Sequence, residues 1–501
     1  MTSSEQFEIT FNTAGEEMAV NDLTRQFSRR ELFLRAMNLA SYFREQGLKV
    51  DDHIAVLVGN RVEYVEILLA SAIAGLWLTP VNWHLAKAEI EYVLKDSECR
   101  LLLLEPKFST LLNDSLENEY RIIEINEKYE NLVAPIGLQS INPDSPAGGL
   151  MMYTSGTTGR PKGVKRARAG DLQQTLSAWA TTGNNIGLDG TGTHLVTGPM
   201  YHAAPLLYAI YDFLNGASIL IMREWASEKA LQLIEAYHVT HSHWVPTMFM
   251  RCLREKADFE RDYDLSSLSL VLHGAAPIGR QLKHDIHHWW GDCLVEYWGG
   301  TESGIITRVG AEDWRNHIGT VGKPLKQFEV FAVDEDKKKL ACGEIGTLYI
   351  RHRDLAEPFS YHGDSEKTES SYLAAGIFTL GDLGYIDIEG YVYLSDRRSN
   401  LIISGGVNIY PAEIEQVLIE HPAVEDVAVF GLKDKEWGQS VHAAVELNSQ
   451  WQTADIEQEL KVFAENSLAR FKIPRSFQQV KKMPRYDSGK LYMSRLLKML
   501  V

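Results

Sequence analysis

A run of serine, threonine and glycine residues that ends in basic residues could bind phosphate. It reads MYTSGTTGRPKGVKR and covers residues 152–166. Glycines let backbone N–H groups turn toward an anion, hydroxyls add neutral donors and a lysine adds charge. The Gly-Lys-Ser/Thr ending of a Walker A loop is absent, and a flexible Gly/Ser linker would rarely carry this ordered mixture. We therefore predict a phosphate-binding loop, with contacts from Thr154, Ser155, Gly156, Thr157, Thr158 and Lys162.

Four later groups of residues could contribute to the same site. They are YHAAP (201–205), HGAAP with EYWGGTES (273–277 and 296–303), FTLGDLGYID with SDRR (378–387 and 395–398), and PRYDSGKLY (484–492). Taken singly, each has an ordinary alternative. A lone histidine such as His202 is more often structural than catalytic. A single lysine near the end of a chain, such as Lys490, is usually a solvated surface charge.

Taken in order, these motifs resemble those of the adenylate-forming superfamily, which includes acyl-CoA synthetases, peptide-synthetase adenylation domains and luciferases. The resemblance covers about Ala55 to Leu496. It is strongest to bacterial fatty-acyl or aryl/cycloalkyl-CoA synthetases, through YHAAP, ISGGVNIYPAEIE and SGK. It implies an ATP-dependent ligase that converts a carboxylic acid into an acyl-AMP and transfers the acyl group to CoA. ATP, Mg²⁺ and CoA are the implied cofactors and co-substrates.

The resemblance also implies where the nucleotide binds. Backbone atoms of small residues would pass along adenine, an aromatic residue would stack on it, and a carboxylate would accept hydrogen bonds from the ribose hydroxyls. These residues are Gly274, Ala275, Ala276, Trp298, Asp382 and Arg397, the last contacting the ribose from the other side. Leu380 departs from the family, which usually has threonine there.

The catalytic roles follow from the same resemblance. Thr301 would hydrogen-bond the α-phosphate, and Glu302 would hold Mg²⁺, a hard cation that prefers oxygen ligands. Lys490 would bridge the substrate carboxylate and the α-phosphate and stabilise the charge that develops there. After the C-terminal domain rotates, Gly405 and Gly406 would line a tunnel for the pantetheine arm of CoA.

The acyl pocket is predicted less specifically. His202 would line it near the carboxylate, together with Tyr201, Trp244, Val245 and Gly299. Aromatic and apolar side chains there favour a hydrophobic or cyclic acid. For the segment around His241 to Trp244, a purely structural role in the core is an equal alternative.

Two other functions stay open at this stage. An amide synthetase would use the same acyl-AMP with an amine or amino-acid acceptor, and the sequence has no feature that excludes it. A degenerate protein that only binds nucleotide is disfavoured, because Glu302, Asp382, Arg397 and Lys490 are all present. Zinc at His284, His287 and His288 is disfavoured, because no carboxylate or cysteine completes a ligand set.

The bulk composition limits partners and location. The chain has 501 residues and a net charge of -17, so nucleic acid is not an expected partner. Its four cysteines are widely spaced, which fits a reducing compartment. The N-terminus lacks a signal-peptide pattern, and the longest apolar run, Ile67 to Val81, is shorter than a membrane span and is predicted to be a buried helix. We expect a cytoplasmic protein, with a homodimer left open.

Alternating strand-like and helix-like segments must position these residues. Examples are the predicted strands 53–59, 99–105 and 268–274, each near a helical stretch. This alternation predicts an α/β fold with largely parallel sheets. After residue 332 the strands become short, which predicts a β-rich subdomain. We therefore expect a large N-terminal domain of layered α/β sheets, residues 1–396, and a small mobile α+β C-terminal domain, residues 397–501.

Overall fold

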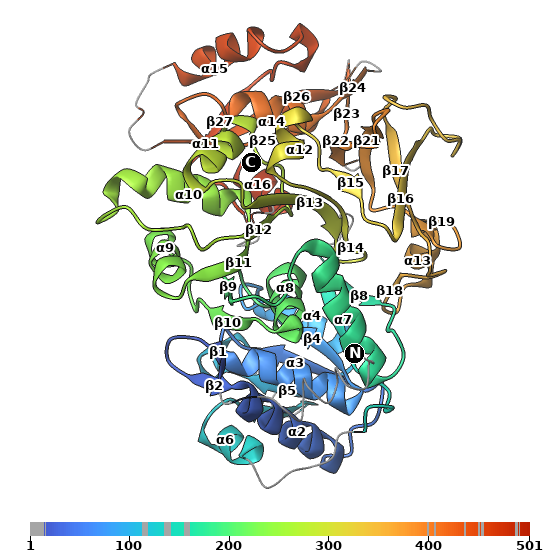
Figure 1. Ribbon diagram of the computed structural model, residues 1–501. Helices are drawn as coiled ribbons and strands as arrows, with labels where there is room; N and C mark the ends of the chain where they lie inside the picture. The colour runs from blue at the N-terminus through green and yellow to red at the C-terminus, as the bar shows by residue number, and fades with distance from the viewer. Residues whose placement is uncertain are drawn as a thin grey trace.

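The described residues fold into four β-sheets with helices packed on their faces (Figure 1). The computed structural model describes residues 15, 17–112, 119–134, 142–154, 161–397, 400–404, 407–434, 437–448, 451, 455–485, 489 and 491–500. Within these residues no helix has the length and apolar composition needed to cross a bilayer. The layered α/β class predicted from the alternating segments is confirmed.

The first large sheet has seven strands in the order β18-β8-β7-β4-β3-β5-β6. Strands β7, β4, β3, β5 and β6 are parallel, while β8 pairs antiparallel with β7 and β18 pairs antiparallel with β8. The strands are β3 (His53–Leu57), β4 (Trp77–Pro80), β5 (Cys99–Leu104), β6 (Arg121–Glu124), β7 (Gly149–Thr154), β8 (Lys162–Arg166) and β18 (Phe359–Tyr361). The helices between them are α3 (Val62–Ala74), α4 (Lys87–Asp96), α6 (Glu127–Val133) and the 3₁₀ helix η1 (Pro106–Leu111).

The second large sheet has nine strands in the order β15-β14-β13-β12-β11-β9-β10-β1-β2. Its central strands β9 to β13 are parallel. The strands are β1 (Met18–Asn21), β2 (Gln26–Ser28), β9 (Thr193–Val196), β10 (Ser218–Ile221), β11 (Val239–Trp244), β12 (Leu270–His273), β13 (Leu294–Gly300), β14 (Gly304–Val309) and β15 (Lys323–Pro324). The helices of this part are α2 (Arg29–Glu45), α7 (Leu172–Ile186), α8 (Ala203–Asn215), α9 (Ser227–Ala236), α10 (Pro246–Glu255), η2 (Lys256–Asp258), α11 (Arg280–Trp290) and α12 (Ala311–Asn316).

Two smaller sheets complete the chain. The third sheet contains β16 (Phe328–Val333), β17 (Gly346–His352), β19 (Tyr372–Ala374), β20 (Ile377–Phe378), β21 (Asp382–Ile386) and β22 (Val392–Arg397), with helix α13 (Ser365–Ser371) beside it. The fourth contains β23 (Ile402–Ser404), β24 (Val407–Ile409), β25 (Val424–Asp434), β26 (Gly438–Leu447) and β27 (Phe477–Val480). Its helices are α14 (Pro411–Leu418), α15 (Ile456–Glu465), η3 (Arg470–Lys472) and α16 (Met493–Met499).

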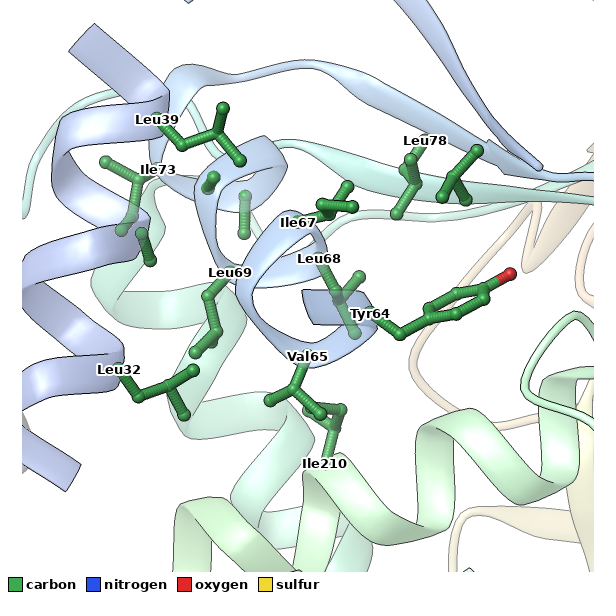
Figure 2. Close-up of a cluster of buried hydrophobic side chains, with 14 of the residues drawn as sticks. Leu32, Leu39, Tyr64, Val65, Ile67, Leu68, Leu69, Ile73, Leu78 and Ile210 are labelled. Atoms are coloured by element: carbon green, nitrogen blue, oxygen red, sulfur yellow. The ribbon is translucent and has the colours of Figure 1, made fainter. Parts of the chain in front are cut away.

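Helix α3 forms the centre of the main hydrophobic core. All 13 of its residues are buried. Figure 2 shows its apolar side chains surrounded by residues of three other elements, namely Leu32 and Leu39 of α2, Leu78 of β4 and Ile210 of α8. Such complete enclosure is typical of a helix that is apolar over most of its surface.

One prediction about this region was wrong. The apolar run Ile67 to Val81 is not a single buried helix, because α3 ends at Ala74 and the run continues as strand β4. Gly75 has φ 78°, a left-handed conformation that glycine adopts without steric cost and that ends the helix. Hydrophobicity alone did not reveal this break.

The far end of helix α8 is fixed by a buried polar cluster. The Asp212 carboxylate accepts hydrogen bonds from Nδ1 of His194 at 2.9 Å and from Nδ1 of His241 at 2.8 Å. Burial alone would raise the pKa of Asp212, but the two imidazoles lower it to about 2. The cluster anchors α8 to strands β9 and β11, so the start of the helix, next to His202, has a defined position.

Candidate active site

Many of the predicted site residues lie at one edge of the nine-stranded sheet. Strands β9, β11, β12 and β13 are neighbours and run parallel, so their carboxyl ends lie along the same edge. The residues that follow these ends are Tyr201 and His202 after β9, Val245 after β11, Gly274–Ala276 after β12, and Gly299–Glu302 at the end of β13. Open α/β sheets bind their ligands at this edge.

A tight hairpin holds Thr301 and Glu302 at its tip. Strand β13 pairs with β14 through Gly300 and Gly304, and only three residues form the turn. A Cβ atom on Gly299 would clash with the carbonyl oxygen of Gly304, so no other residue fits there without moving the turn. Glycine is therefore required here for steric reasons. The tight turn that it allows sets the positions of Thr301 and Glu302.

We expect Gly299→Ala to disturb this turn. The free energy of unfolding should fall by about 1–3 kcal/mol, the usual cost of overpacking, and nucleotide affinity should fall with it. Gly310→Ala, just beyond the same hairpin, is the matched control, because a Cβ there meets nothing within 4 Å. Chemical denaturation and calorimetry with ATP would measure both effects. An alanine variant that binds ATP as tightly as the wild type would show that the turn is not part of the site.

Arg166 joins the hairpin to the phosphate-loop strand. Its Nε–H donates to the carbonyl oxygen of Thr301 at 2.6 Å, and Nη2 donates to that of Gly300 at 3.3 Å. Arg166 is the last residue of β8, which begins at Lys162. The two large sheets are thus connected directly at the proposed phosphate site.

The two ends of the phosphate loop are paired. Thr154, the last residue of β7, lies opposite Lys162, the first residue of β8, in an antiparallel ladder. The hydroxyl of Tyr153 donates to Asp96 at 2.7 Å and fixes the end of β7 to helix α4. Ser155, Gly156, Thr157 and Thr158 lie outside the described residues, so their predicted contacts with phosphate stay predictions.

Trp298 and Asp382 are brought together, as the nucleotide prediction requires. The indole Nε1–H donates to Oδ2 of Asp382 at 2.8 Å, and both side chains are buried. Asp382 follows Gly381, which has φ 82° and turns the chain into β21. Arg397 lies opposite Asp382 in the pairing of β21 with β22. A carboxylate can accept several hydrogen bonds, so Asp382 can bind ribose hydroxyls while it holds the indole.

The segment Gly274–Ala276, which is predicted to contact adenine, is shaped by close packing. A Cβ atom on Gly274 would lie 2.8 Å from the carbonyl oxygen of Tyr297, which is too close for any side chain. Ala275 has φ 67°, an uncommon conformation for a residue other than glycine. Gly274 is buried, while Ala275 is exposed and Ala276 is half-buried. Ala275 and Ala276 are therefore accessible at the edge of the sheet.

Glu302 is fixed by a residue that the sequence analysis missed. The hydroxyl of Tyr361, in β18, donates to Oε1 of Glu302 at 2.9 Å. Burial and the nearby Glu302 carboxylate raise the pKa of Tyr361 well above its usual range, so the hydroxyl keeps its proton. Lys162 has a partner close to Tyr361 in the sequence. Its ammonium lies 3.2 Å from the Asp364 carboxylate.

The Mg²⁺ implied by the family fits this arrangement. Among the described residues, no three His, Cys, Asp or Glu side chains are grouped so that they could hold a metal by themselves. A Mg²⁺ ion that bridges phosphates needs only one or two protein carboxylates, and takes its other ligands from phosphate and water. Glu302, half-buried at the tip of the hairpin, can supply that carboxylate.

Aromatic side chains surround the residues predicted to meet the acid. Tyr201 packs edge-on against Trp83 with ring centroids 4.4 Å apart, and its ring lies 4.4 Å from that of His202. Trp83 stacks in turn on Phe108. His202 precedes the first residue of α8. Trp83 and Phe108 lie outside the sequence motifs. Only their aromatic character could have indicated that they belong to the acyl pocket.

Most side chains of β11, the strand that ends at Trp244, are buried in the core. Trp244 is fully buried and packs edge-on against Trp225 and Trp290. These contacts fit the structural alternative for this residue. Burial lowers the pKa of His243 to about 3, so its imidazole is neutral, and its Nε2 lies 2.9 Å from the hydroxyl of Tyr297.

Gly489, the residue before the predicted catalytic lysine, lies against this site. A Cβ atom on Gly489 would be 3.4 Å from Oγ1 of Thr247 and 4.0 Å from Cβ of Val245. Arg485 donates to the carbonyl oxygen of Gly489 at 3.0 Å. Lys490 itself, like Gly405 and Gly406, lies outside the described residues.

Comparison with known proteins places this arrangement in a family. The family described as AMP-binding enzyme matches residues 7–359, and the one described as AMP-binding enzyme C-terminal domain matches residues 413–490. A 2-succinylbenzoate–CoA ligase of Bacillus velezensis is 31% identical over 484 residues, which cover 96% of this chain and 95% of that protein. A fatty acid–[acyl-carrier-protein] ligase of Streptomyces coeruleorubidus is 29% identical over 93% of this chain and 90% of its own length.

A solved structure gives the same result. The o-succinylbenzoate CoA synthetase of Bacillus subtilis, in complex with its acyl-adenylate intermediate, superposes with a TM-score of 0.84. The two sequences are 27% identical, and the match covers 99% of this chain and 97% of the other. The chain belongs to the AMP-binding enzyme family, that is, to the adenylate-forming superfamily.

Proposed function

We propose that this protein is an AMP-forming carboxylate–CoA ligase for a hydrophobic or cyclic acid. The main support for the proposal is that hydrogen bonds connect the seven-stranded, nine-stranded and third sheets where the predicted site residues lie. Arg166 joins the phosphate-loop strand to the Thr301 turn, and the Trp298–Asp382 hydrogen bond joins that region to the predicted ribose carboxylate. Loop, turn and ribose carboxylate would together hold one nucleotide.

The first half-reaction makes the acyl-AMP. An oxygen of the substrate carboxylate attacks the α-phosphorus of ATP, and the bond from that phosphorus to the bridging oxygen of pyrophosphate breaks. Thr301 would donate to the α-phosphate, and Lys490 would stabilise the charge on the oxygens around the phosphorus. Glu302 would hold Mg²⁺, which supplies charge neutralisation when bound. The position of Gly489 beside Thr247 supports a role for Lys490 in this step.

Nucleotide binding would use the remaining predicted residues. Thr154, Ser155, Gly156, Thr157, Thr158 and Lys162 would cradle the phosphates. Gly274, Ala275, Ala276 and Trp298 would contact adenine, and Asp382 and Arg397 would contact the ribose. Tyr201, His202, Val245 and Gly299 would line the acyl pocket. Trp244, enclosed by other indoles, would support that wall from behind.

The second half-reaction transfers the acyl group. The thiol sulfur of CoA attacks the carbonyl carbon of the acyl-AMP, the bond from that carbon to the AMP oxygen breaks, and the thiol proton is released. For this step we propose that residues 397–501 rotate against residues 1–396. The rotation would withdraw Lys490 and bring Gly405 and Gly406 to the site, where they would line the pantetheine tunnel. A cytoplasmic location and a homodimer stay predictions.

The acid is proposed from the relatives and from the pocket. The similar proteins named above are ligases of 2-succinylbenzoate and of a fatty acid. The aromatic wall of Trp83, Phe108 and Tyr201 suits a flat or apolar acid. The 2-succinylbenzoate ligase is a CoA ligase, so CoA is the acceptor we propose.

A panel of carboxylic acids tests this function. Purified protein is incubated with ATP, Mg²⁺ and each acid, including 2-succinylbenzoate, aromatic acids and fatty acids, with CoA or with a mixture of amino acids. Mass spectrometry reads the products. We expect an acyl-CoA and AMP from at least one aromatic, cyclic or fatty acid. An amide in place of the thioester would overturn the choice of acceptor, and ADP in place of AMP would overturn the reaction class.

A further inference from the structure

The lysine at the exit of the phosphate loop is held by a carboxylate. Nζ of Lys162 lies 3.2 Å from Oδ2 of Asp364, with 28% and 25% of the two side chains exposed. The backbones that carry them are also fixed, because the N–H of His362 donates to the carbonyl oxygen of Gly163 at 2.8 Å. The pair therefore forms between two well-anchored segments that are about 200 residues apart in the chain.

Asp364 has a second bond that fixes its carboxylate. Oδ1 accepts a hydrogen bond from the backbone N–H of Lys367 at 3.0 Å, which caps the start of helix α13. Oδ2 is the oxygen that faces Lys162. One oxygen thus holds the helix and the other holds the lysine, so the direction of the carboxylate is set by the fold.

The same segment also holds the proposed metal carboxylate. Tyr361, three residues before Asp364, donates to Glu302. The ammonium of Lys367 lies 4.0 Å from the centre of the Tyr361 ring. One short segment, residues 361–367, therefore contacts both groups that would bind the phosphates and their Mg²⁺. Neither contact was predicted from the sequence.

Lys162 can pair either with Asp364 or with a phosphate of ATP. The relative strengths of these two interactions decide which partner it has when ATP binds. A partly exposed ion pair contributes little, because water screens it and two side chains must be ordered to form it. A charge-assisted hydrogen bond from an ammonium to phosphate is stronger, and the triphosphate carries several negative charges. A phosphate group should therefore displace Asp364 from Lys162.

We propose that Asp364 is a positioning residue that holds Lys162 in the nucleotide-free protein and gives it up to a phosphate of ATP. This rests on the proposed function. In the free protein, the Asp364 carboxylate keeps the lysine at the mouth of the loop. On binding, the ammonium exchanges the carboxylate for phosphate, and Asp364 keeps its bond to α13.

Asp364→Asn isolates this role. Asparagine caps a helix start as well as aspartate does, so the variant should fold and keep α13 while it loses only the charge. We expect it to bind ATP about two- to five-fold more tightly in calorimetry, because the competing ion pair is gone. Lys162→Met should bind ATP more weakly. In the Lys162→Met background, Asp364→Asn should bring no gain, because the competition acts through the lysine.

Glu366→Gln is the matched control, since Glu366 is exposed in the first turn of the same helix. It should leave ATP affinity unchanged. A second measurement needs no nucleotide. The rate of acetylation of Lys162 by limiting acetic anhydride, read by peptide mass, should rise in Asp364→Asn and stay at the wild-type rate in Glu366→Gln.

Three results would overturn the proposal. The first is weaker ATP binding by Asp364→Asn, and the second is an equal gain in the Lys162→Met background, which would indicate a general charge effect. The third is an acetylation rate of Lys162 that does not change. Failure of the proposed function looks different, because the wild type would then bind no ATP at all, whereas the acetylation rates would still decide whether Asp364 holds Lys162.

Discussion

Replacing Lys490 by alanine is expected to slow acyl-AMP formation about 100- to 1000-fold, the usual cost of removing a group that stabilises charge in a transition state. Two anions, the acid and the α-phosphate, must approach each other, and negative charge builds on the phosphorus oxygens as pyrophosphate leaves. The neighbouring Gly489 lies against Thr247 and Val245, at the edge of the sheet where the other site residues gather. We therefore assign to Lys490, the next residue, the role of the cation that bridges the two anions.

The same variant should still complete the second half-reaction. Preformed acyl-AMP with CoA should give the thioester at a rate within a few-fold of the wild type, because we assign Lys490 to adenylation alone. Lys481→Ala, which removes an exposed lysine from the segment just before, is the control and should not alter either step. Normal acyl-AMP formation by Lys490→Ala would contradict the role of the lysine. Equal loss in both steps would contradict the separation of the two half-reactions.

Asp382→Ala is expected to raise the KM for ATP about 10- to 150-fold, which corresponds to the loss of about 1.5–3 kcal/mol of hydrogen bonding to a charged group. Two losses add up in this variant. The ribose hydroxyls lose their acceptor, and the buried Nε1–H of Trp298 loses the partner it has at 2.8 Å. The indole beside the nucleotide then loses its fixed orientation.

Asp382→Asn separates these two losses. Its amide oxygen can still accept from Trp298, so the free energy of unfolding should stay closer to that of the wild type than in Asp382→Ala. Its weaker acceptor should still raise the KM for ATP. Steady-state kinetics with varied ATP, together with denaturation curves for both variants, provide the comparison. A KM that stays at the wild-type value in Asp382→Ala would show that the ribose binds elsewhere.

Much of the fold could be predicted because it depends on local patterns. The alternation of apolar strands with amphipathic helices specifies a layered α/β protein. The error in the run from Ile67 to Val81 has a clear physical cause. Helix and strand are equally apolar when both are fully buried, so only Gly75 marks the boundary between them.

The site was predictable to the extent that its residues lie in ordered motifs. Thr301 and Glu302 follow the end of β13, Asp382 begins β21, and the sheets bring them to one region. Arg166, Tyr361 and Asp364 were not assigned roles, because those roles depend on pairings between distant segments. Tyr361 reaches Glu302 only because β18 pairs with β8 at the edge of another sheet. No local pattern in the sequence encodes that pairing.

An oxygen-isotope experiment tests the central claim most directly. The wild-type protein is given ATP, CoA and an accepted acid whose carboxylate carries ¹⁸O at both oxygens, and the AMP is examined by mass spectrometry. If the carboxylate attacks the α-phosphorus and the thiol then breaks the bond from the carbonyl carbon to the AMP oxygen, each AMP must carry one ¹⁸O from the acid. AMP without ¹⁸O, or ¹⁸O in inorganic phosphate or pyrophosphate, would contradict an acyl-AMP intermediate and the account built on it.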